Sequence, residues 1–95
     1  MLAGGWKADS ALTEEEFQMV IGLQHHVQER AGREFAHFHP VAIKKQVVAG
    51  MNYLVKVQVS DDHYIHVKIY KPLPHTGEPA GVTEVHLDKS HHDEL

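Results

Sequence analysis

The stretch VAIKKQVVAGMNYLVKVQV, residues 41–59, decides the fold, because apolar side chains alternate along it on both sides of Gly50. A period of two places successive side chains on opposite faces of a strand. Before Gly50 the pattern separates two faces, with Val41, Ile43, Lys45 and Val47 on one and Ala42, Lys44 and Gln46 on the other. After Gly50 the alternation continues at Tyr53, Val55, Val57 and Val59. Few residues remain between the two strands, so they are predicted to form a hairpin.

Two further strands are predicted along the chain. The turn Ser60-Asp61-Asp62 leads into a third alternating segment, with Ile65, Val67 and Ile69 on one face. A weaker fourth strand is predicted at residues 82–87. Short links make these strands an antiparallel meander within residues 37–88, whose hairpins alternate between the two ends of the sheet. The loop at residues 47–50 and the loop at residues 73–80 should therefore lie at the same end.

One helix is predicted ahead of the strands, at residues 14–31. Thr13 and Glu16 can form a capping box, in which each side chain accepts the backbone N–H of the other residue. An apolar stripe with one polar member follows at helical spacing: Phe17, Val20, Ile21, Gln24, Val27 and Ala31. Gly32 then supplies a stop signal. The expected class is α+β, with this helix covering one face of the antiparallel sheet.

Length and composition narrow the class of protein. The chain has 95 residues, no cysteine, ten histidines and a formal net charge of −4. We expect a single domain, residues 1–95, with a flexible arm at residues 1–12 and a tail at residues 89–95. The acidic balance argues against nucleic acid as a partner, and no segment is apolar enough to span a membrane. The first residues lack the apolar run of a secretory signal and cysteine is absent, so the expected location is cytoplasmic.

The two loops expected at one end of the sheet carry apolar side chains. The segment Gln46-Val47-Val48-Ala49-Gly50 has apolar residues where turns usually have polar ones. In Lys71-Pro72-Leu73-Pro74-His75 a leucine stands between two prolines, which restrict the backbone and reduce the entropy lost on binding. Both features have a structural alternative, because Val47 and Val48 could continue into the core and proline-rich connections are common.

These segments resemble the motifs of stefins, the small cysteine-free branch of the cystatin family. Residues 46–50 are similar to the Q-V-V-A-G hairpin of cystatins, continued by Asn52-Tyr53. Leu73-Pro74 resembles the L-P of the second stefin hairpin, and Gly4-Gly5 resembles the glycine of the N-terminal trunk. The resemblance implies the cystatin fold, an antiparallel sheet of four to five strands wrapped around one long N-terminal helix. It also implies reversible, tight-binding inhibition of papain-like cysteine proteases (cathepsins), with no enzymatic activity and no cofactor.

The same resemblance implies how a protease would be bound. The trunk and the two hairpins would form a wedge in the active-site cleft, with the trunk glycine close to the catalytic thiol but offering no cleavable bond. The implied protease-binding residues are Leu2, Ala3, Gly4, Gly5, Gln46, Val47, Val48, Ala49, Gly50, Leu73, Pro74 and His75. Two residues depart from the family pattern: Met51 replaces a small polar residue, and Trp6 replaces a smaller side chain. Trp6 could contact the protease rim or pack over the start of the helix.

Other readings of the residues stay open. A histidine-rich protein could bind metal or be structural without inhibiting a protease, and His37 with His39 on one strand face is the best pair, although it lacks the spacing of a structural zinc site. An enzyme would need an activated nucleophile, yet the serines lie in the arm, a turn and the tail. A monomer is expected, but exchange of strands through the Val48–Met51 hairpin could give a domain-swapped dimer.

Overall fold

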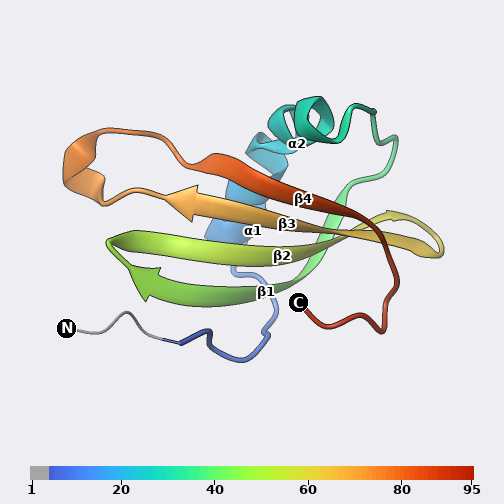
Figure 1. Ribbon diagram of the computed structural model, residues 1–95, viewed down its shortest axis with the longest axis horizontal. Coiled ribbons are helices and arrows are strands. Elements are labelled where there is room, and N and C mark those ends of the chain that lie inside the picture. The colour runs from blue at the N-terminus through green and yellow to red at the C-terminus, as the bar shows by residue number, and fades with distance from the viewer. Residues whose placement is uncertain (1–4) are drawn as a thin grey trace.

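The computed structural model describes residues 5–95 and contains two helical segments followed by a four-stranded antiparallel sheet (Figure 1). The elements in chain order are α1 Glu14–Gly22, α2 Gln24–Ala31, β1 His39–Val48, β2 Gly50–Ser60, β3 His63–Lys71, the 3₁₀ turn η1 Pro74–Thr76, and β4 Gly81–Lys89. The strands lie in the order β1-β2-β3-β4, which is a meander. The predicted α+β class and the antiparallel order of the strands are confirmed.

The helical region has the predicted bounds but is not one continuous helix. It breaks at Leu23, which has a φ of −99° and a ψ of 3°, and the Leu23 N–H donates to the Val20 carbonyl in a tighter turn, at 3.0 Å. Gly22, a poor helix former, directly precedes the break. Gly32, with a φ of 72°, ends α2 as predicted. No helix within residues 5–95 is both long enough and apolar enough to cross a membrane.

The core lies between one face of the sheet and the helical region. α1 contacts β1 and α2 contacts β4, so the helical region crosses the sheet from one edge to the other (Figure 1). At the centre of the sheet Ile43, Val55 and Val67 are register partners across three strands, and all are fully buried. Val20 and Val27 of the helices are buried against them. Each such side chain contributes about 1.5–3 kcal/mol of burial free energy, so the alternating pattern supplies most of the core.

The first strand departs from the predicted alternation near its start. The register shifts between Pro40 and Ala42, so that Pro40 pairs with Val57 and Val41 is the extra residue of a bulge. Pro40 is buried, whereas Val41, which the alternation places on the same face as the buried Ile43, is only partly buried. Proline has no N–H to donate to the ladder, and within sheets it is found at edge strands, at strand starts and at bulges.

The second face of the sheet is partly covered by the segment that follows β4. Side chains alternate along each strand, so Lys44 and Lys56 point away from the helices. Lys56 Nζ donates to the His91 carbonyl and Lys44 Nζ donates to the Leu95 carbonyl, both at 2.9 Å. The segment from His91 to Leu95 is therefore held against this outer face by two lysines of the sheet.

Candidate functional site

The β1–β2 hairpin turns at a single residue. Val48 pairs with Gly50, which leaves Ala49 at the tip. Gly50 has a φ of 116°, and a Cβ at this position would lie 2.5 Å from the Lys71 carbonyl oxygen, so glycine is required here. Val47 is 41% exposed and Ala49 is exposed, while Val48 is half-buried. The alternative in which Val47 continues into the core is therefore wrong.

A tyrosine of β3 supports this tip. Tyr70 Oη donates a hydrogen bond to the Ala49 carbonyl oxygen. Asn52 is the register partner of both Tyr70 and Gln46, and Asn52 Nδ2 donates to Gln46 Oε1 at 3.1 Å. Gln46 is thus part of the strand below the tip. Sequence reasoning missed Tyr70, which the register of the β2–β3 hairpin would have placed opposite Asn52.

The second predicted segment forms a loop that is braced by its own hydrogen bonds. The Leu73 carbonyl accepts bonds from the Thr76 N–H at 3.0 Å and from the Thr76 hydroxyl at 2.9 Å. Pro74 begins η1, where its restricted φ suits the turn. Leu73 is 39% exposed, and Pro74 and His75 are exposed as well. The loop therefore presents an apolar side chain to solvent on a backbone that is already held in place.

The segment before α1 runs along the free edge of β1. Ser10 and Ile43 exchange both backbone hydrogen bonds at 2.9 Å, and the Lys7 N–H donates to the Lys45 carbonyl at 2.9 Å. These contacts are antiparallel, so the chain followed backwards from Ser10 to Gly5 leads toward the β1–β2 tip. The predicted trunk residues Leu2, Ala3 and Gly4 lie outside the described residues.

Exposed apolar side chains gather at this end of the sheet. Within residues 5–95 the exposed large hydrophobic residues are Trp6, Val47 and Leu73. The β1–β2 tip and the β3–β4 loop lie at the same end of the sheet, and the β2–β3 hairpin lies at the other (Figure 1). We call this surface the loop end and define it as Gly5–Lys7, Gln46–Gly50 and Leu73–His75. Large apolar side chains that stay exposed together at one end of a sheet mark a candidate interaction site.

An ion pair fixes β1 to the start of α1 just before the loop end. Lys45 Nζ lies 2.7 Å from Glu16 Oε2, and both side chains are partly shielded from solvent. The Glu16 N–H donates to the Thr13 hydroxyl at 3.1 Å and the Thr13 N–H donates to Glu16 Oε1 at 2.9 Å, which is the predicted capping box. Burial by itself would raise the pKa of Glu16, but the Lys45 ammonium and the Thr13 N–H outweigh it and lower that pKa. Beside the pair, burial raises the pKa of the Tyr53 hydroxyl.

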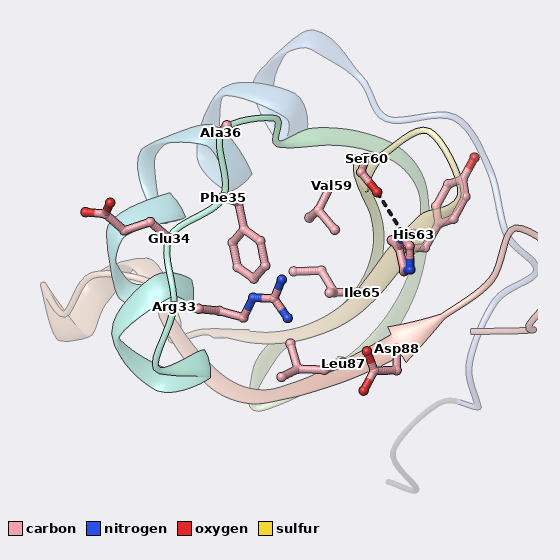
Figure 2. Close-up of a pocket in the computed structure, with 11 residues that line it drawn as sticks. Arg33, Glu34, Phe35, Ala36, Val59, Ser60, His63, Ile65, Leu87 and Asp88 are labelled. Carbon is pink, nitrogen blue, oxygen red and sulfur yellow. Dashed lines mark hydrogen bonds between the residues drawn. The ribbon is translucent and has the colours of Figure 1, made fainter.

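A pocket of about 280 Å³ lies at the opposite end, beside the β2–β3 hairpin (Figure 2). Arg33 extends over its apolar floor, with the guanidinium carbon 5.5 Å from the centroid of the Phe35 ring. Ser60 Oγ and His63 Nδ1 share a hydrogen bond of 2.9 Å at its rim. None of the predicted site residues lines this pocket.

The histidine pairs give no support to the metal-binding reading. Within residues 5–95 no group of three or more His, Cys, Asp or Glu side chains is arranged to hold a metal ion. His37 and His39, the best pair in the sequence, have ring centroids 6.2 Å apart. The rings of His25 and His26 are closer than their separation around a helix suggests, with centroids 4.0 Å apart, but they are sequence neighbours without a third ligand in the described chain.

Comparison with known proteins addresses the family directly. The sequence profile of the Cystatin domain matches residues 10–92. The chain is 34% identical over 95 residues to cystatin-B of Bos taurus, which covers 100% of this chain and 97% of that protein. It is 36% identical over 92 residues to stefin-C of Bos taurus (97% and 91% covered) and 33% identical over 95 residues to cystatin-B of Homo sapiens (100% and 97% covered). The chain therefore belongs to the cystatin family, in its stefin branch, a family of thiol protease inhibitors and not of enzymes.

Proposed function

We propose that this protein is a reversible, tight-binding inhibitor of papain-like cysteine proteases of the cathepsin type. Membership of the cystatin family supports the class of activity. The observation that supports the mode of binding is the exposure of Trp6, Val47 and Leu73 at one end of the sheet. Apolar side chains on braced loops are costly to leave in water, so a partner that covers them is favoured.

The proposed wedge consists of the trunk and the two loops of the loop end. In this proposal Leu2 and Ala3 occupy the unprimed pockets of the protease, and Gly4, followed by Gly5, passes the catalytic thiol without offering a cleavable bond. The tip residues Val47, Val48 and Ala49, flanked by Gln46 and Gly50, cover the primed side, and Leu73, Pro74 and His75 close the far edge. Binding forms and breaks no covalent bond. Because hydrogen bonds brace both loops beforehand, little conformational entropy is lost on docking.

The inhibitory form in this proposal is a cytoplasmic monomer. A chain without cysteine does not depend on an oxidising compartment to fold. In the monomer the strands on either side of Ala49 pair with each other, and this pairing presents Val47. A domain-swapped dimer formed through the Val48–Met51 hairpin would straighten that turn, so the tip would no longer be available to a protease.

A charge placed on the hairpin tip tests the wedge. Val47→Asp should fold, because Val47 is 41% exposed. In a protease complex the new carboxylate would be buried without a partner, at a cost of about 3 kcal/mol or more. The inhibition constant should therefore rise by about 100-fold or more. The measurement is a titration of active-site-quantified papain, followed through hydrolysis of a fluorogenic substrate.

Ala36→Asp is the matched control for this experiment. Ala36 is exposed and lines the pocket at the opposite end, so the variant adds the same charge outside the wedge. It should inhibit papain as the unchanged protein does, close to one-to-one. If Val47→Asp inhibits as well as Ala36→Asp, the wedge is wrong. If the unchanged, folded protein does not inhibit at all, the proposed function itself is wrong.

A further inference from the structure

We propose that Tyr70 is a positioning residue for inhibition, which holds the β1–β2 tip in its binding shape through the hydrogen bond from its hydroxyl to the Ala49 carbonyl. The inference rests on the proposed function and assigns a role to a residue outside the loop end. Tyr70 itself is half-buried on β3 and needs no contact with the protease to act.

The geometry explains why a side chain of β3 can reach the tip. Tyr70 is the register partner of Asn52, which stands two residues after Gly50 on the neighbouring strand. A Cβ on Gly50 would lie 3.1 Å from Tyr70 Oη and 3.2 Å from Tyr70 Cε1, so the phenol ring lies against the backbone of this glycine. Because Gly50 has no side chain, the space beside its backbone is free for the Tyr70 ring, and the Tyr70 hydroxyl can reach the Ala49 carbonyl.

The bond adds a connection that the hairpin does not have by itself. The pairing of Val48 with Gly50 joins β1 only to β2, and the exposed Val47 and Ala49 project beyond the core. Tyr70 ties the Ala49 carbonyl to β3, three residues before Leu73 begins the second loop. The β2–β3 ladder already reaches Met51, which pairs with Lys71, and this hydrogen bond extends the connection with β3 to the residue at the tip itself. A wedge that must enter one cleft with two loops gains affinity when their relative position is set in advance.

The variant Tyr70→Phe removes this hydroxyl and leaves the ring. The matched control is Tyr64→Phe, which removes a hydroxyl from a buried tyrosine of the same strand at the opposite end of the sheet. We expect Tyr70→Phe to raise the inhibition constant for papain about three- to tenfold, the range that corresponds to one net hydrogen bond. Tyr64→Phe should leave it unchanged. Both variants are assayed at a temperature at which circular dichroism shows them fully folded, so a loss of stability alone cannot change the inhibition constant.

Amide hydrogen exchange provides a second readout that does not depend on a protease. The amides of residues 48–51 should exchange faster in Tyr70→Phe than in the unchanged protein or in Tyr64→Phe, while the amides at the centre of β2 should not change. If Tyr70→Phe keeps the inhibition constant of the unchanged protein, Tyr70 is not a positioning residue for inhibition. If the unchanged protein does not inhibit papain, the proposed function is wrong, whatever the role of Tyr70. Hydrogen exchange then tests Tyr70 by itself: if the tip amides exchange no faster in Tyr70→Phe than in the unchanged protein, the hydroxyl of Tyr70 does not hold the tip in place.

Discussion

His66 is a buried histidine of β3 that should make the fold sensitive to acid. It is 4% exposed, and its Nε2 has no hydrogen-bond partner within the described part of the chain. Its register partners are Lys56 of β2 and His86 of β4, and Lys89 and Asp93 also face it from the end of β4 and the following segment. Burial, reinforced by Lys89 and Lys56, lowers the pKa of His66 to about 4.

The direction in which pH changes the stability follows from which state, folded or unfolded, binds the proton more tightly. Between the ordinary histidine pKa of 6.5 and the folded-state pKa of about 4, the unfolded chain takes up a proton that the folded chain does not. The free energy of unfolding must therefore fall as the pH falls through this window. Relative to pH 7 the expected loss is about 2 kcal/mol at pH 5 and about 3 kcal/mol at pH 4. A small domain has a total stability of only about 5–15 kcal/mol, so the loss is a large fraction of it.

Glu16 contributes in the same direction but at lower pH. Its lowered pKa gives stability that is fully present above the unfolded carboxyl pKa of 4.5 and is lost as the pH falls through the folded value. The two groups can therefore be separated, because the His66 effect begins near pH 6.5. A decline in stability that starts only near pH 4.5 would point to carboxyl groups such as Glu16 and not to His66.

The variant His66→Leu removes the titrating ring from the buried site. Urea unfolding, followed by far-ultraviolet circular dichroism at several pH values, should show that the stability of the variant relative to the unchanged protein rises by about 3 kcal/mol from pH 7 to pH 4. The control is His63→Leu, which removes an exposed histidine from the same strand and accounts for any general effect of a lost imidazole. The reasoning is refuted if His66→Leu and the unchanged protein lose stability in parallel, or if nuclear magnetic resonance shows the His66 ring protonating near pH 6.5.

Two further outcomes are expected at the hairpin tip. Gly50→Ala should lower the free energy of unfolding by about 1–3 kcal/mol, because alanine is strained at a φ of 116° and its Cβ would meet the Lys71 carbonyl. Gly77→Ala, at a φ of 70° with no atom within 4 Å of the added Cβ, should cost less in the same urea titration, and equal losses would contradict the argument. A domain-swapped dimer should inhibit far more weakly than the monomer, since strand exchange straightens the Val48–Met51 turn. Size-exclusion chromatography with inhibition measured in each fraction checks this, and equal inhibition by both forms would show that the turn is not needed.

Most of the fold could be predicted because its signals are local. The period-two pattern identifies the core face at Ile43, Val55 and Val67, and the short links between strands leave only a meander. The bulge at Val41 could not be found in this way, because it depends on how Pro40 pairs with another strand. The helix break at Leu23 is equally hidden, since the apolar stripe continues through it and only the backbone angles show the tighter turn.

The loop end could be predicted in part for the same reason. Apolar residues in turns are visible in a sequence, so the sequence alone points to Val47 and Leu73, and the structure leaves both exposed. The pairing of Lys7 with Lys45 along the edge of β1 could not be foreseen, because no alternation marks the segment before α1. This pairing uses backbone N–H and C=O groups, which nearly every residue has, so the residue types of the segment do not indicate it.

Tyr70 shows why a supporting residue is harder to find than a contact residue. It lies within a strand of ordinary composition, and its role depends on the register that places it near Gly50. Gly50 in turn meets two requirements, a positive φ for the turn and the absence of a side chain where the phenol ring passes. Gly50→Ala must therefore disturb the shape of the turn and the path of Tyr70 together, whereas Tyr70→Phe removes only the hydrogen bond to Ala49. If both variants weaken inhibition but only Gly50→Ala lowers stability strongly, the shape of the tip and its bracing are separate contributions to binding.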